Sequence, residues 1–130
     1  MVNVPLPQIV CFTFCDEVQV VNGKYCILGV FYRIFPPLFP YTYNLNIVMG
    51  WYGEQGMHHF DIILNDPHGQ PILMLPAYRF ELTLDRPYVN VVLQAQIPLH
   101  VPGNYHFIVY LNDELYGEYP LQVVVTSSIN

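Results

Sequence analysis

Hydrophobic and polar residues alternate with a period of two along most of this sequence, which is the pattern of half-buried β-strands. Residues 43–51 show it clearly, because Leu45 and Ile47 alternate with polar residues such as Asn46. No segment has a convincing helical period, and the 12 prolines scattered along the chain would interrupt most helices. The pattern therefore predicts an all-β protein.

Turn-forming residues separate the apolar segments. Asn22-Gly23 predicts a tight hairpin, because both residues accept a positive φ. The Asp-Pro-His-Gly sequence at 66–69 fits a tight turn, and a last hairpin is expected to turn near Asn112-Asp113. The expected strand segments, in chain order, are residues 8–16, 18–21, 24–34, 43–51, 57–65, 72–75, 78–84, 89–97, 105–111 and 116–125.

Short strands at this spacing, without helices, predict an antiparallel β-sandwich of about seven or eight strands, immunoglobulin-like or C2-like. We expect a single domain over residues 1–130 with an ordered core at 8–126, since no repeat or linker divides the chain. Pro120 cannot donate a hydrogen bond to a neighbouring strand, so it should lie at a sheet edge or a bulge.

Residues 1–34 differ from the middle strands because their strands are apolar on both faces. In an extended strand Phe12 and Phe14 would face one side, and Cys11 and Cys15 the other. In a two-layer sandwich one face of each sheet is exposed to water. Strands that are apolar on both faces therefore need a second cover, that is, further protein packed over the exposed face. That cover is either the chain's own loops or another subunit, and we favour a subunit.

The amino-acid composition argues against two classes of binding partner, nucleic acids and membranes. The chain is 53% hydrophobic and 11% charged, with a net charge of −6. Nucleic-acid binding is not expected, because it needs clustered Lys and Arg. No apolar run reaches the length of a membrane span, and the N-terminus lacks the pattern of a secretory signal. We therefore expect a cytoplasmic protein with no membrane partner, in which Cys11, Cys15 and Cys26 are free thiols.

Several short sequence motifs occur along the chain, and their order is more specific than any one of them. They are Phe14-Cys15-Asp16-Glu17-Val18, Asn22-Gly23-Lys24, Ile27-Leu28-Gly29-Val30-Phe31, Phe39-Pro40, His59-Phe60, Asp66-Pro67 with Gly69, and Pro102-Gly103-Asn104-Tyr105 with Gly117 and Leu121-Gln122-Val123. Together, over about residues 9–125, they resemble an uncharacterised family of short bacterial single-domain proteins with an immunoglobulin-like or C2-like β-sandwich, a domain of unknown function. The resemblance implies a fold and an intracellular bacterial setting, and no chemistry. The Pro-Gly-x-Tyr phrase resembles the tyrosine corner of immunoglobulin-type domains, whose hydroxyl ties down a crossing loop.

Metal binding is not expected. His58 and His59 are adjacent on a strand and so point to opposite faces. His59 and Asp61 share a face, but the sequence offers no dependable third ligand. Cys11 and Cys15 would lie ~13 Å apart on an extended strand, too far to share a zinc ion. The turn aspartates, which are Asp16, Asp66, Asp85 and Asp113, form no Asp-x-Asp pair of the kind that a calcium site would use.

Catalysis is not expected either. Cys15 is followed by Asp16 and Glu17, whose carboxylates disfavour a nucleophilic thiolate. The sequence contains no Gly-x-Ser-x-Gly elbow and no phosphate-binding glycine loop. We predict no enzymatic activity, no catalytic residue and no cofactor.

The apolar, proline-rich loop at 35–41 is the best candidate contact surface, with Phe35, Leu38, Phe39 and Tyr41 as candidate partner-binding residues. The loop either closes an open end of the sandwich or docks on a partner. We expect a non-enzymatic structural or protein-interaction module that self-associates as a homo-oligomer or binds another protein. The alternative is a small-ligand or carbohydrate-binding module that uses surface aromatics. A monomeric mass together with Trp51 in an open groove would favour it, whereas the alternation places Trp51 in the core.

Overall fold

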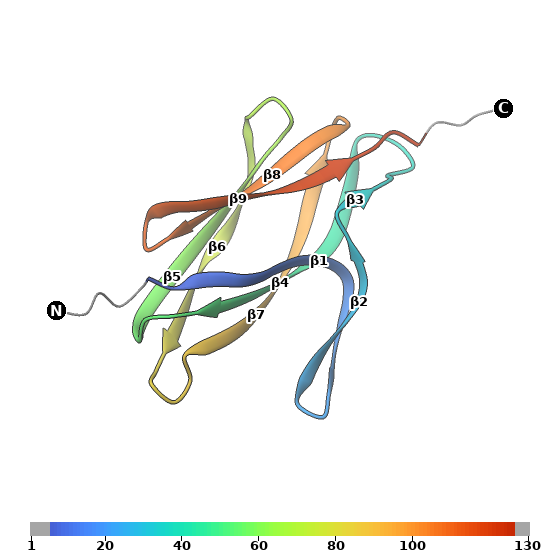
Figure 1. The fold of residues 1–130 in the computed structure, drawn as a ribbon. Coiled ribbons are helices and arrows are strands. Elements are labelled where there is room, and N and C mark those ends of the chain that lie inside the picture. Colours follow the sequence, from blue (N-terminus) through green and yellow to red (C-terminus); the bar gives the residue numbers. More distant parts are fainter. Residues whose placement is uncertain (1–5, 127–130) are drawn as a thin grey trace.

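Nine strands and no helix make up residues 6–126, the part of the chain that this computed structural model describes (Figure 1). The strands are β1 (Gln8–Val21), β2 (Lys24–Phe31), β3 (Arg33–Ile34), β4 (Tyr41–Tyr52), β5 (Gly56–Asn65), β6 (Pro71–Leu82), β7 (Tyr88–Leu99), β8 (Gly103–Leu111) and β9 (Glu114–Val123). With no helix in these residues, none is available to span a membrane. The ends of the expected 1–130 domain, including the N-terminal residues examined for a secretory signal, lie outside the described residues.

Two sheets form the predicted sandwich, which confirms the fold class. One has four strands in the order β2-β1-β4-β7, and the other has five in the order β3-β9-β8-β5-β6. All neighbouring strands are antiparallel except the short β3, which runs parallel to the end of β9. Pro120 lies on the stretch of β9 that β3 leaves uncovered, as expected for a residue without an N–H.

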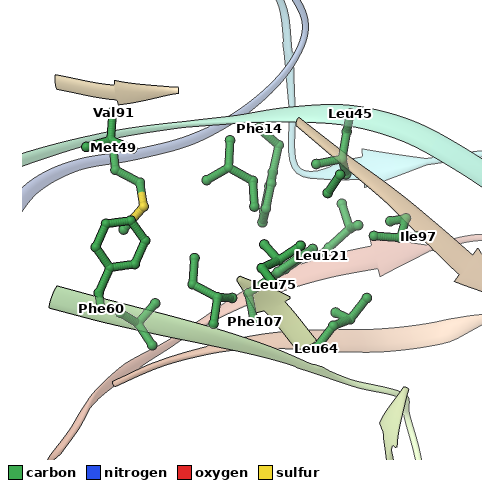
Figure 2. Packing of buried hydrophobic residues seen from close by; sticks show 14 of the residues in the cluster. Phe14, Leu45, Met49, Phe60, Leu64, Leu75, Val91, Ile97, Phe107 and Leu121 are labelled. Carbon is green, nitrogen blue, oxygen red and sulfur yellow. The ribbon is translucent and has the colours of Figure 1, made fainter. Parts of the chain in front are cut away.

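The core lies between the sheets and is filled from the alternating positions that the sequence indicates (Figure 2). On β4, Leu45, Ile47 and Met49 point inward, and Trp51 has no exposed surface. The indole ring stacks on Phe60 of the opposite sheet at a centroid distance of 5.7 Å. Trp51 is thus a core residue, as predicted, and it offers no platform in an open groove.

Both predicted hairpin turns are present. Asn22 and Gly23 have φ values of 52° and 74°, and Asn112 and Asp113 have φ values of 50° and 70°. These left-handed pairs match the right-handed twist of the flanking strands. The hydroxyl of Tyr105 donates to the carbonyl oxygen of Val101 at 2.6 Å, so the expected tyrosine corner is formed.

The expectations for β6 were partly wrong. The two segments predicted at 72–75 and 78–84 form one strand, because β6 is an edge strand and Pro76 lies in the bulge between Leu75 and Tyr78, where the pairing with β5 shifts. The strand also ends earlier than expected, at Leu82. Thr83 and Arg86 are joined by a pair of backbone hydrogen bonds that turn the chain, and this leaves Leu84 exposed.

Candidate interaction surface

The hairpin of β1 and β2 leaves the body of the sandwich. Pairing of β1 with β4 ends at Cys15, whereas pairing of β1 with β2 continues to Val21 opposite Lys24. Residues 16–29, named the ribbon here, are therefore a two-stranded extension of the four-stranded sheet, and Figure 1 shows it projecting beyond the other strands. A two-stranded ribbon is at best marginally stable on its own in water.

Gly29 allows the ribbon to bend away. Its φ is +71°, and a Cβ at this position would lie 2.5 Å from Asp16 Oδ2. Asp16 is itself fixed to β4, because its carboxylate accepts a hydrogen bond from the Tyr43 hydroxyl at 3.2 Å and its carbonyl oxygen accepts one from Asn46 Nδ2 at 3.0 Å. The local sequence thus sets where the ribbon departs.

The inner side of the ribbon partly covers the outer face of its own sheet. Val48 points to that outer face but is only 4% exposed, and it lines a groove of about 510 Å³ together with Val20 and Ile27 of the ribbon. Cys15 lies fully buried beside the bend, and burial, with the nearby Asp16 carboxylate, raises the pKa of its thiol. The chain thus supplies part of the second cover that the doubly apolar strands were predicted to need.

The remaining surface of this region stays apolar and exposed. The exposed large apolar side chains from the ribbon to the 35–41 loop are Val20, Val21, Tyr25, Leu28, Val30, Tyr32, Phe35 and Leu38. The side chain of Val30 is 64% exposed, so the second cover over these strands is incomplete. We refer to β2 and these side chains together as the β2 surface.

The free edge of β2 is also less protected than the other edges. Prolines stand in β6 (Pro76), in β7 (Pro98) and on the uncovered stretch of β9 (Pro120), whereas β2 contains none. Prolines and charged residues are the usual means by which edge strands avoid pairing with other chains, and β2 carries only Lys24, at its first position. Among the described strands β2 pairs only with β1, so one side of its backbone has no strand partner.

The 35–41 loop divides the predicted contact residues into two groups. Phe35 and Leu38 are 58% and 60% exposed, whereas Phe39 packs against the core and Tyr41 is half-buried at the start of β4. Pro36 is buried, and its carbonyl oxygen accepts a hydrogen bond from the Thr126 hydroxyl at 3.2 Å. One side of the loop therefore closes the sandwich, and the other side faces solvent.

The expected absence of a third ligand near His59 and Asp61 was wrong. Asp113 lies beside them, and one ligand atom from each of the three residues lies within 4.8 Å of the others. The turn that carries Asp113 was recognised from the sequence. Its position was not, because that depends on β8 pairing with β5, which adjacent sequence does not reveal.

Surface aromatics converge at one place, a shallow groove of about 310 Å³ where β1, β2 and β9 meet, lined by Phe12, Phe31, Tyr32 and Tyr119 among others. A shallow hollow of about 440 Å³ lies on the outer face of the four-stranded sheet, lined by amides such as Asn44, Gln94 and Gln96 and by no aromatic side chain among the described residues. Trp51 is fully buried, so it is not available as a surface aromatic for the carbohydrate-binding alternative.

A family profile matches residues 10–124, nearly the whole chain. The chain belongs to a family of unknown function, DUF6941. This agrees with the resemblance found in the sequence. Among curated proteins, no sequence matches this DUF6941 member.

Solved structures match this chain at low sequence identity. A β-glucosidase from Listeria innocua superposes with a TM-score of 0.55 at 9% sequence identity, over 91% of this chain and 16% of the glucosidase chain. An immunoglobulin-like protein from Pseudomonas aeruginosa aligns with a TM-score of 0.44 at 14% identity, over 92% of this chain and 98% of that chain. The DUF6941 chain thus spans only a small part of the glucosidase, and at this identity the likeness concerns the fold alone.

Proposed function

We propose that this protein is a non-enzymatic interaction module of the bacterial cytoplasm that self-associates, with two copies pairing along β2. The observation that carries the proposal is the free edge of β2, an eight-residue strand whose flanking side chains are apolar and exposed. An exposed edge of this kind is a ready template for strand addition.

A second copy of the same chain is the occupant that fits this edge best. An antiparallel strand pair is compatible with a twofold axis, in which the same surface meets itself and every contact occurs twice. Each β2 then supplies both the N–H and the C=O groups that the other lacks. The product is a continuous sheet of eight strands, four from each copy.

Charge favours contact at this surface. Residues 24–41 contain Lys24 and Arg33 and no acidic residue, although the chain has ten acidic residues and a net charge of −6. Two copies that approach through this segment keep most of their negative charge apart. Like-charge repulsion, which opposes association elsewhere on the molecule, is therefore weakest here.

The side chains around the edge supply the hydrophobic part of the contact. Leu28 and Val30 are exposed on β2 itself, and Phe35 and Leu38 are exposed in the loop that follows β3. Burial of such side chains contributes about 25 cal/mol for each Å² of apolar surface removed from water. Pairing also stabilises the ribbon, which has no third strand beyond Cys15.

Two features support the non-enzymatic and cytoplasmic parts of the proposal. Burial raises the pKa of the Cys15 thiol, which opposes formation of the thiolate that a nucleophile needs. All three cysteines are free thiols, which agrees with a reducing compartment.

The test compares two doubly substituted proteins by sedimentation equilibrium in reducing buffer. Leu28→Lys with Val30→Lys places two charges at the β2 edge. Met74→Lys with Leu115→Lys makes the same charge change at exposed positions on the other sheet. We expect the unsubstituted protein and the control to reach twice the 15.1 kDa chain mass, and the β2 variant to stay at 15.1 kDa.

The proposal fails if the unsubstituted protein stays at the mass of one chain over the whole concentration range. It also fails if the β2 variant, shown to be folded by its circular dichroism, associates as strongly as the control. Because both variants change net charge equally, a generic effect of charge on association would move them together.

A further inference from the structure

A compact set of metal-binding donors lies on the outer face of the five-stranded sheet, away from the β2 surface. His59 and Asp61 point outward from β5, and Asp113 reaches them from the turn between β8 and β9. One donor atom from each lies within 4.8 Å of the other two, and His59 Nε2 is 3.0 Å from Asp113 Oδ1. Two donors on one zinc ion, each bonded at ~2.0–2.2 Å, lie no more than ~4.4 Å apart. The 3.0 Å pair meets this limit, and the 4.8 Å limit on the set leaves the third donor only a small side-chain adjustment from it.

A residue outside the donor set holds the two elements together. The backbone N–H of Asn112 donates to the carbonyl oxygen of His59 at 2.8 Å, and the backbone N–H of His59 donates back to Asn112 Oδ1 at 3.0 Å. The Asn112 amide nitrogen donates to Nδ1 of the buried His58 at 3.1 Å. The turn is thus fixed to β5 before any ligand binds, and Asp113 is placed against His59.

Asp113 is an unusual residue for its place in the turn, as a comparison with Gly23 in the hairpin of β1 and β2 shows. Both turns have the same backbone geometry, with a second residue at φ 74° in Gly23 and 70° in Asp113. Glycine adopts this left-handed conformation at no steric cost, and a residue with a side chain does not. The chain uses glycine in one hairpin and a carboxylate in the other, at the position where the side chain meets His59.

We propose that His59, Asp61 and Asp113 bind one divalent transition-metal ion. One imidazole nitrogen and two carboxylate oxygens are donors typical of Zn²⁺ and its neighbours in the first transition row, with water completing the coordination. Ca²⁺ fits poorly, because it takes six to eight oxygen ligands. The carboxylates also outweigh the one neighbouring cation, Arg79, which lies opposite His59 on β6.

The donors are accessible from solvent. The side chain of His59 is 35% exposed and that of Asp113 is 80% exposed. An ion can therefore bind to the folded protein without opening the core. Strand β2 belongs to the other sheet, so this inference does not depend on the proposed self-association.

The test is titration with Zn²⁺ by isothermal calorimetry, and with Co²⁺ followed by absorption. We expect one ion per chain, a Co²⁺ spectrum without the charge-transfer band of thiolate ligands, and a rise in melting temperature. His59→Ala should weaken Zn²⁺ binding by more than about tenfold. His68→Ala, which removes an exposed histidine from another turn, should leave binding unchanged.

Asp113→Gly separates metal binding from folding. It installs the residue that the turn geometry favours, so the metal-free variant should melt no lower than the unsubstituted protein, while its Zn²⁺ affinity falls by more than about tenfold. The inference is overturned if the unsubstituted protein binds no Zn²⁺, if the Co²⁺ spectrum shows thiolate ligands, or if His59→Ala and Asp113→Gly bind Zn²⁺ as tightly as His68→Ala.

Discussion

Replacement of Asn112 by alanine should lower the free energy of unfolding by about 2–4 kcal/mol. The Asn112 side chain donates to Nδ1 of His58 at 3.1 Å and accepts from the N–H of His59 at 3.0 Å. His58 is buried, and its other ring nitrogen bonds the Glu54 carbonyl oxygen at 2.9 Å, so water cannot easily replace the lost donor. A buried polar atom left without a partner costs about 1–3 kcal/mol. Alanine at the φ of 50° that this position requires adds about 1 kcal/mol.

The matched control is Asn22→Ala in the other hairpin. Asn22 has nearly the same φ, 52°, but the described residues include no hydrogen-bond partner for its side chain. This substitution therefore carries only the backbone cost of about 1 kcal/mol. Urea unfolding of both variants, followed by tryptophan fluorescence, measures the difference. Equal losses of stability in the two variants would show that the Asn112 side chain contributes nothing beyond its backbone conformation.

Three further predictions concern titration, thiol reactivity and the ribbon. Burial is the larger cause and the nearby Tyr116 the smaller cause of a raised pKa at Tyr119, which is about 12. Tyr119 therefore stabilises the fold fully below pH 10, and this stabilisation is lost as the pH rises to about 12. Tyr119→Phe should remove that part of the alkaline loss in urea unfolding measured against pH; an unchanged pH profile would contradict it. Cys15 should be the slowest of the three cysteines to react with iodoacetamide, as mass spectrometry of digests would show, and labelling faster than at the other two would refute this. Gly29→Ala should loosen the ribbon, because its Cβ would overlap Asp16, and unchanged amide exchange in residues 16–29 would refute that reasoning.

The alternation of side chains was enough to predict the sandwich and much of its core. The period-two pattern around Trp51 identified the buried face of β4, and Asn22-Gly23 and Asn112-Asp113 identified two hairpins. These features are local, since each depends on residues within one strand or one turn. They follow from the steric preferences of a short segment.

Features that depend on strand order could not be predicted in this way. The alternation predicted separate strands at 72–75 and 78–84, whereas a bulge in an edge strand accommodates Pro76 within a continuous β6. It also gave no third neighbour for His59 and Asp61, because Asp113 reaches them only through the pairing of β8 with β5. Among the predicted loop residues, Phe35 and Leu38 are exposed, whereas Phe39 packs against the core. The sequence cannot separate these residues, because all of them are apolar.

Amide hydrogen exchange of β2 is a direct test of self-association, because pairing along this edge would protect backbone N–H groups that have no partner within one chain. The protein is labelled in reducing buffer at a low and a high concentration, and exchange is compared for residues 24–31. Self-association through β2 predicts slower exchange in β2 at the high concentration, with little change in β6 and β7, the edge strands at the opposite ends of the two sheets. Exchange in β2 that stays fast at every concentration would contradict self-association through this edge.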